Sequence, residues 1–147
     1  MRCRRVPPAS FDVIYSSLAF HYAKDWDALL DKMHTVLRPG GIIIASSHHP
    51  DYWNKNPTGN SHTNDRGVTL TEHTAELPGG VKIVYYNHPS TASMCKSFSY
   101  AGFEVLHSFA PSVVKFDGAE KLRENYESLK NKNSQTPLFY IIKAKKC

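Results

Sequence analysis

The most regular pattern of hydrophobic positions runs from residue 25 to residue 38. Apolar side chains recur there at three- and four-residue spacing, which places them on one face of a helix: Trp26, Leu29, Leu30, Met33, Val36 and Leu37. Asp25 is a suitable N-cap, because its side chain can accept a hydrogen bond from the first turn. The segment Pro39-Gly40-Gly41 is expected to end the helix, since glycine readily adopts the positive φ found at helix ends.

Two apolar segments flank this predicted helix. Phe11–Ser16 is short and rich in β-forming residues, which is typical of a buried strand. Ile42–Ala45 is apolar at every position, so we expect a strand that is buried on both faces, as in a parallel sheet. A strand, a helix and a strand in this order predict a right-handed crossover and an α/β fold.

The rest of the chain alternates polar segments with short apolar ones. Residues 46–67 are polar and contain prolines, glycines and asparagines, so a loop or an insertion is expected. Val68–Leu77 and Val81–Tyr86 flank Pro78-Gly79-Gly80, which predicts a hairpin. The later elements are a helix from Ser90 to Gly102, a strand at Phe103–Leu106, a helix at Asp117–Lys130 and a final strand at Leu138–Ile142.

Composition is that of an ordinary globular protein. Hydrophobic residues make up 41% and charged residues 21% of the 147 positions, which allows a core without extreme charge. The longest uninterrupted apolar run is too short for a transmembrane helix, and the basic residues 1–10 lack the apolar region of a secretory signal. Cys3, Cys95 and Cys147 are too far apart in sequence for a zinc motif or a disulfide framework, which favours a reducing, cytoplasmic setting.

The net charge of +5 raises the question of an acidic partner. Much of the excess lies near the two ends of the chain: Arg2, Arg4, Arg5, Lys143, Lys145 and Lys146. No basic helix with interleaved aromatic residues is present in the sequence. We therefore expect neither a nucleic-acid partner nor a membrane partner.

Several segments, taken in order, resemble the class I S-adenosylmethionine-dependent methyltransferases, in particular the type 11-like group. Phe11–Tyr22 is similar to the fourth strand of that family and the loop after it, and Leu37–Gly41 resembles its “LxPGG” turn. Ile42–Ser46 would be the fifth strand. Ser99–Val105 resembles the “AGF” junction before the sixth strand, and Leu138–Lys145 would be the last, antiparallel strand.

This resemblance implies a fold and a reaction. The fold is an α/β one, the C-terminal half of a Rossmann-like methyltransferase sheet, mostly parallel with the last strand antiparallel, and with an inserted loop and hairpin. Residues 1–147 would form one partial domain, with a flexible N-terminus at 1–10, a strand–helix–strand unit at 11–47, an insertion at 48–90 and C-terminal helices and strands at 91–147. The implied reaction is methyl transfer from S-adenosylmethionine to a small molecule, and His49-Pro50 fits the small-molecule subgroup.

One departure from the family bears on activity. The family holds its cofactor mainly through a glycine-rich loop after the first strand and an acidic residue after the second. None of the glycines here forms a GxGxG pattern, and nothing before Phe11 supplies either feature. We therefore expect impaired methyl transfer from a truncated domain. The alternatives are a non-catalytic remnant and a partner-binding subunit completed by another chain, with the strand at Phe11–Ser16 exposed for self-association or for that partner.

The candidate cofactor and catalytic residues follow the first predicted strand, because ligands of doubly wound sheets bind beyond the carboxyl ends of the strands. By resemblance, Ser16, Ser17 and Leu18 would lie beside the methionine part of S-adenosylmethionine. An ordinary loop whose serines cap backbone groups is the alternative. His21 is the candidate catalytic base, because imidazole can take up a proton near neutral pH. The competing interpretation is that His21 and Tyr22 only pack at the start of the helix.

The candidate substrate residues follow the second predicted strand. His48, His49, Tyr52 and Trp53 are the residues that would line an acceptor pocket, since aromatic side chains often do so, although Tyr52 and Trp53 could instead cover the sheet edge. We expect no metal site, because adjacent histidines in a loop rarely point at one ion and neither HxH nor HExxH occurs. Tyr85 is assigned to the core.

Overall fold

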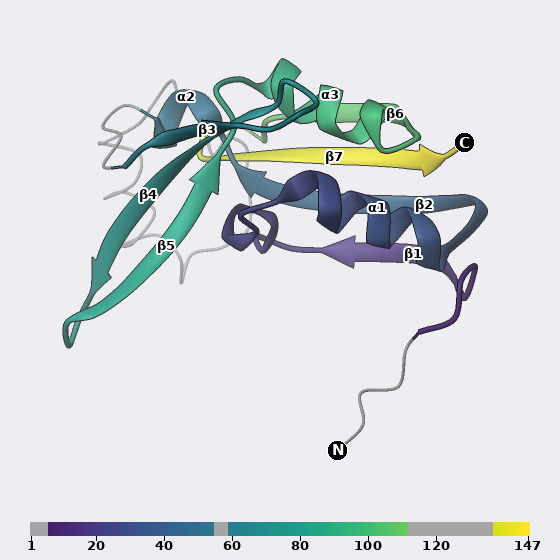
Figure 1. The fold of residues 1–147 in the computed structure, drawn as a ribbon, viewed down its shortest axis with the longest axis horizontal. Helices are drawn as coiled ribbons and strands as arrows, with labels where there is room; N and C mark the ends of the chain where they lie inside the picture. The colour runs from purple at the N-terminus through teal and green to yellow at the C-terminus, as the bar shows by residue number, and fades with distance from the viewer. Residues whose placement is uncertain (1–5, 55–58, 112–136) are drawn as a thin grey trace, which may run out of the picture.

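The structure, a computed structural model, describes residues 6–54, 59–111 and 137–147 (Figure 1). It contains a four-stranded sheet and a smaller three-stranded sheet. The helix predicted at Asp117–Lys130 lies outside the described residues. The strand–helix–strand unit at the start of the chain is present, which confirms the predicted α/β class.

The four-stranded sheet has the order β1 (Phe11–Ser16), β2 (Leu37–His48), β7 (Phe139–Lys146) and β6 (Phe103–Phe109). β1 and β2 run parallel, as the crossover predicts. β7 is antiparallel to both of its neighbours, so the last strand has the predicted direction and the other three strands share one direction. The first strand has the predicted bounds, whereas β6 and β7 are both longer than predicted.

Helix α1 (Trp26–Val36) connects β1 to β2 and begins as predicted. The carboxylate of Asp25 accepts the N–H of Ala28 at 2.8 Å, which is an N-cap bond. The end differs from the prediction, because the helix stops at Val36 and Pro39-Gly40-Gly41 lies within β2. The β1–β2 register shifts beside this segment, so the turn belongs to the strand pairing rather than to the helix.

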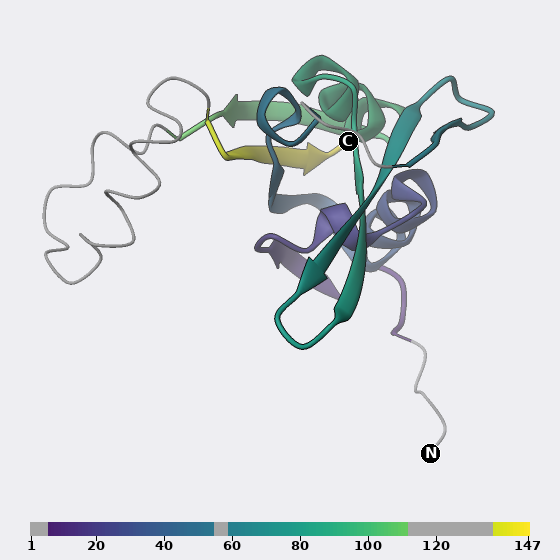
Figure 2. The same cartoon turned by 90° about the vertical axis from the view of Figure 1, so that its left-hand side faces the viewer.

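The core lies on one face of the four-stranded sheet. α1 and α3 (Thr91–Tyr100) cover that face (Figures 1 and 2). Alternate residues of β2, among them Ile43 and Ala45, are buried beneath the helices, whereas Ile42 and Ile44 on the opposite face are only half-buried. The prediction that this strand is buried on both faces is therefore met on one face only. α3 begins directly after Ser90, the predicted start of this helix, and the Ser90 side chain accepts the N–H of Ser93 at 3.1 Å.

The insertion after β2 contains more structure than the predicted loop. β2 continues to His48 and is followed by the short helix α2 (Pro50–Trp53). The three-stranded sheet then forms from β3 (Ser61–Thr63), β4 (Thr69–Leu77) and β5 (Val81–Asn87), in that order. The β4–β5 hairpin confirms the prediction. β3 was not predicted, because its side chains are polar and exposed.

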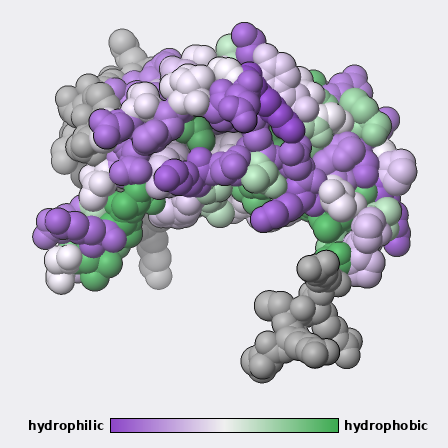
Figure 3. All heavy atoms as spheres, viewed as in Figure 1, coloured by the Kyte–Doolittle hydropathy of each residue, from purple (hydrophilic) through white to green (hydrophobic). Residues whose placement is uncertain are grey.

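The surface mixes polar and apolar side chains (Figure 3). Exposed apolar residues gather on β1 (Phe11, Val13 and Tyr15) and near the end of the β4–β5 hairpin (Leu77, Val81 and Val84). Within residues 6–54, 59–111 and 137–147, no helix has the length and apolar character needed to cross a membrane.

Candidate functional site

The carboxyl ends of β1 and β2 lie next to each other, with Ser16 paired to Ala45. Directly after β1, Leu18 adopts a φ of +50°, a conformation that residues other than glycine rarely take. Its N–H donates to the Oγ of Ser46 at 2.9 Å. Backbone strain of this kind concentrates at ligand sites, where the surrounding structure holds it in place. The predicted cofactor residues Ser16, Ser17 and Leu18 thus form one exposed to half-buried turn at a strand end.

His21 lies in the short 3₁₀ helix η1 (Phe20–Tyr22) after this turn, and only 3% of its surface is exposed. Its ring stacks on the ring of His48 with centroids 3.6 Å apart and planes 8° from parallel. Burial lowers the pKa of His21 to about 4, so the imidazole is neutral at neutral pH. Its Nδ1 has no hydrogen-bond partner among the described residues. The neutral ring can accept a proton, but its low pKa makes it a weak base.

His48 is sandwiched between two rings. On the side away from His21 it stacks on Trp53, with centroids 4.0 Å apart and planes 12° from parallel. Its Nδ1 lies 3.2 Å from the side-chain oxygen of Asn87, and Trp53 donates its indole N–H to the carbonyl oxygen of Leu138 at 2.9 Å. Burial, and to a lesser extent the neighbouring His21, lower the pKa of His48 to about 3. His21, His48 and Trp53 therefore form one aromatic stack, to which we refer below as the ring stack.

The other two predicted substrate residues lie differently. His49 is buried beside Tyr140, with ring centroids 5.8 Å apart, and its Nδ1 accepts the N–H of Asp51 as the cap of α2. Successive residues of extended backbone point to opposite sides, which separates His49 from the ring stack. Tyr52 is half-buried and packs edge-on against Trp53 at 5.1 Å. Of the four predicted substrate residues, His48 and Trp53 therefore lie in the ring stack, Tyr52 lies at its edge, and His49 points away from it.

Residues of the inserted sheet also border the ring stack and were not among the candidates. Tyr85 of β5 packs edge-on against His48 at 5.0 Å and stacks on His73 of β4 at 5.1 Å. His73 in turn lies 3.2 Å from the side-chain oxygen of Asn54. Tyr85 and His73 are cross-strand partners, so the hairpin register around Pro78-Gly79-Gly80 is the sequence signal that could have found them.

A metal centre has no support in this region. Within the part of the chain that the structure describes, no group of three or more histidine, cysteine, aspartate or glutamate side chains is arranged to hold an ion. The histidine rings stack face to face, whereas a metal needs their nitrogens to converge on one point.

Comparison with known proteins gives a family match and several structural matches. Residues 3–45 match the family described as “Methyltransferase domain”. A protein of Haemophilus influenzae described as uncharacterized is 39% identical over 59 residues, and malonyl-[acyl-carrier protein] O-methyltransferase 1 of Coxiella burnetii is 43% identical over 42 residues. These matches cover 35% and 29% of this chain, and 23% and 15% of the two relatives.

Solved structures share the fold over nearly the whole chain. One is a protein of Listeria monocytogenes provisionally assigned to the S-adenosylmethionine-dependent methyltransferases, with a TM-score of 0.69 and 21% identity over 98% of this chain. Another is an S-adenosylmethionine-dependent methyltransferase of Mesorhizobium loti, with a TM-score of 0.66 and 23% identity over 97% of this chain. This chain spans 65% of the length of each.

Proposed function

We propose that this chain is a member of the class I S-adenosylmethionine-dependent methyltransferases, whose family model its residues 3–45 match. In this proposal the turn after β1 contacts S-adenosylmethionine, and the methyl group goes to a small molecule beside the ring stack. The family implies S-adenosylmethionine as the cofactor, which supplies the electrophilic methyl group when bound. The observation that carries the proposal is Leu18, held at positive φ by Ser46 at the end of a parallel strand.

The residues of the turn fit part of this cofactor. Ser17 is exposed, and the chain around it offers hydroxyl and backbone carbonyl oxygens, which suit the amino group of the methionine part. The side chain of Leu18 is 38% exposed and offers an apolar surface beside the strand end. Ser46 has the role of holding the Leu18 N–H, so that the turn keeps one conformation before any ligand arrives.

The ring stack supports a role in orienting the acceptor. Methyl transfer to a small molecule depends mainly on alignment of the acceptor atom with the methyl group. Trp53 and Tyr85 present fixed aromatic surfaces, since Trp53 is anchored through its N–H to Leu138. A small movement that opens the stack would let the unpartnered Nδ1 of His21 accept a hydrogen bond from the small molecule that receives the methyl group. We assign His21 to orientation and, in acceptors that must lose a proton, to proton uptake.

We also propose that this chain alone binds the cofactor weakly and transfers methyl groups slowly. Within the described residues, the candidate contacts are confined to Ser16, Ser17 and Leu18. The alternatives are a non-catalytic remnant and, as the second candidate function, a partner-binding subunit that is completed by another chain. The exposed apolar residues of β1 are the observation that favours this second candidate.

Titration of the protein with S-adenosylhomocysteine, followed by NMR, separates these possibilities. We expect weak, saturable shifts confined to the backbone signals of residues 16–18 and 46. The Ser46→Ala variant should reduce the affinity severalfold, because the Leu18 N–H loses its acceptor, whereas Ser99→Ala on α3 is the matched control and should leave the affinity unchanged. Micromolar affinity would contradict the weak binding, and the absence of shifts in the turn would reject the methyl-transfer assignment.

A further inference from the structure

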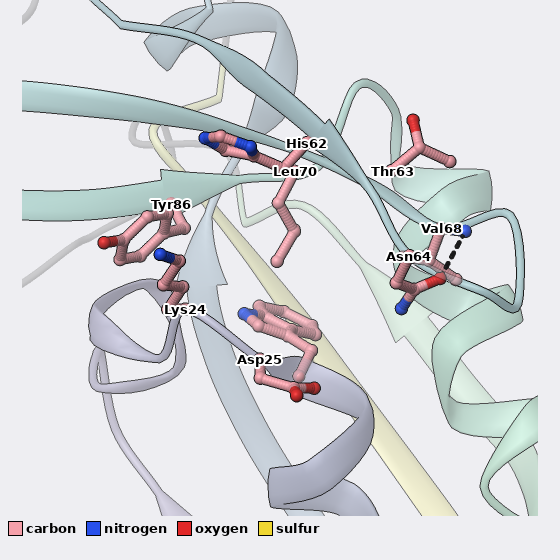
Figure 4. Close-up of a pocket in the computed structure, with 9 residues that line it drawn as sticks. Lys24, Asp25, His62, Thr63, Asn64, Val68, Leu70 and Tyr86 are labelled. Atoms are coloured by element: carbon pink, nitrogen blue, oxygen red, sulfur yellow. Dashed lines mark hydrogen bonds between the residues drawn. The ribbon is translucent and has the colours of Figure 1, made fainter.

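A cavity of about 310 Å³ lies between the start of α1 and the three-stranded sheet (Figure 4). Its apolar lining comes from both parts. Trp26 is the first residue of α1, Val68 directly precedes β4, Leu70 lies in β4 and Tyr86 lies in β5. This volume is at the lower end of the range for small-molecule sites, and an apolar lining is typical of them. A single ring with a short substituent fits such a space.

Trp26 brings a hydrogen-bond donor to the cavity lining. Its side chain is 2% exposed, and its indole N–H has no hydrogen-bond partner among the described residues. A buried donor without a partner destabilises the fold, so such donors usually have an acceptor supplied by protein, water or ligand. A ligand with an acceptor oxygen would remove this cost.

The acidic residues near the cavity already have partners. Asp25 on the cavity wall caps the N-terminus of α1, where the helix dipole favours its charge. Asp27 accepts a hydrogen bond from Asn64 at 2.6 Å, and Asp31 pairs with Arg66 at 3.0 Å. Each of these carboxylates therefore accepts a hydrogen bond within the fold, and Arg66 brings a positive charge to Asp27 and Asp31.

Lys24 also lies on the cavity wall, and its charge is not paired among the described residues. Its side chain is exposed and takes part in no ion pair within the described ranges 6–54, 59–111 and 137–147. Its ammonium is thus available to an acidic ligand, whereas the Asp25 carboxylate on the same wall already accepts the cap bond of α1.

From the apolar lining, the unpartnered indole N–H and the unpaired ammonium, we propose that this cavity binds a small molecule that carries a ring and a carboxylate. The ring contacts Trp26 and Leu70, and the carboxylate accepts from the indole N–H near Lys24. None of the residues lining the cavity belongs to the turn after β1 or to the ring stack. The proposal therefore stands apart from methyl transfer and does not depend on it.

Three probes with the same ring and chain but different head groups test this proposal: phenylpropionate, phenylpropanol and phenylpropylamine. The readout is the pair of tryptophan indole N–H signals in an NMR titration, since the chain has two tryptophans and Trp53 lies outside the cavity. We expect all binding to shift the Trp26 signal and to leave the Trp53 signal in place. Phenylpropionate should bind about two- to fivefold more tightly than phenylpropanol, the range of one exposed ion pair, and phenylpropylamine most weakly.

Two variants and one control variant extend the test. Lys24→Gln should remove the preference for phenylpropionate over phenylpropanol, whereas Lys32→Gln, an exposed lysine that does not line the cavity, should keep it. Val68→Phe, which fills part of the cavity, should weaken all three probes. Equal affinity for the three probes, an unchanged preference in Lys24→Gln, or shifts at Trp53 in place of Trp26 would overturn the proposal.

Discussion

Four buried or half-buried histidines share one property at the scale of single residues: each has a lowered pKa. Burial is the main cause for His21, His48, His73 and His88, and it brings the pKa of His21 to about 4 and those of His48 and His88 to about 3. All four rings are therefore neutral at neutral pH. Their stacked and edge-on contacts need no charge, which is why these rings can pack inside the protein.

These histidines predict loss of stability in acid. An unfolded histidine takes up its proton near pH 6.5, whereas folded His21, His48 and His88 resist protonation down to about pH 4 or below, and burial lowers the pKa of His73 in the same direction. Between these limits the unfolded state binds more protons, so the free energy of unfolding is highest above pH 6.5 and falls as the pH decreases. Each histidine contributes a slope of up to about 1.4 kcal/mol per pH unit. Urea denaturation between pH 7.5 and pH 4.5 measures the combined slope.

A pair of variants assigns that slope to the buried rings. His88→Phe should flatten the pH dependence, since His88 is 1% exposed and its Nε2 has no partner among the described residues. His62→Gln is the matched control, because His62 is exposed, and it should keep the slope of the original protein. Equal slopes in both variants would show that carboxylates, not histidines, govern the acid response.

Gly40 gives a second prediction at this scale. Its φ is +76°, and an added Cβ would have only the Cε of Lys145 nearby, at 3.7 Å, so conformation rather than space restricts the position. Gly40→Val should reduce the free energy of unfolding by about 1 kcal/mol or more, because β-branched residues tolerate positive φ poorly. Gly40→Asn should cost clearly less, since asparagine adopts this region more readily. Urea midpoints that are equal for the two variants would contradict the argument.

At the scale of the elements, α1 depends on its cap. The Asp25 carboxylate satisfies an N–H of the first turn, and loss of such a cap typically costs about 1 kcal/mol. Asp25→Ala should lower the free energy of unfolding by roughly this amount, measured by urea denaturation. Asp25→Ser should restore most of it, because serine caps equally well. A loss that serine does not restore would mean that the charge, and not the cap bond, matters.

The sequence predicted the elements whose patterns are strong and local. The helical spacing of Trp26 and Leu30, the apolar run at Ile42–Ala45 and the glycines of the β4–β5 turn each determine one element with little help from the rest of the chain. β3 was missed because its Ser-His-Thr sequence has no apolar periodicity. Cross-strand side-chain hydrogen bonds, such as Ser61 to Thr71 at 2.9 Å, support it instead.

The candidate site was predictable only in part, for the same reason. His48 is the last residue of β2, and His21 and Trp53 follow the ends of β1 and β2, so a topological rule brings the three to one edge of the sheet. Tyr85 and His73 reach the same place through the inserted sheet, and their position depends on hairpin register and on how that sheet packs. Such long-range packing leaves no signal in a local pattern of hydrophobic positions.

At the scale of the whole molecule, β1 is an edge of the four-stranded sheet as far as the described residues show. Phe11, Val13 and Tyr15 are 45%, 55% and 73% exposed, and Asp12, their only acidic neighbour on the strand, pairs with Arg38 at 2.7 Å. An exposed apolar edge favours pairing with another chain. We expect the protein to self-associate at micromolar concentration, as measured by sedimentation or light scattering.

A charge on this strand should reduce the association. Val13→Lys places a strongly hydrated group on the edge, which natural edge strands use against pairing. Phe109→Lys, an equally exposed aromatic position on β6 at the other edge, is the matched control and should change the association less. A monodisperse protein before any substitution would contradict the prediction.

The central position of β7 determines the order in which the strands of this sheet can pair during folding. β7 fills the place between β2 and β6, so its residues 139–146 must meet residues 37–48, about a hundred positions earlier in the chain. Contacts between such distant segments form slowly, because the intervening chain loses entropy before the strands gain any hydrogen bonds. β1, α1 and β2 can pair early, whereas β7 is the sheet neighbour of β6 among the described strands, so β6 joins the sheet only with β7. Refolding should therefore proceed in milliseconds to seconds rather than microseconds, with formation of the β7 ladder as the slow event.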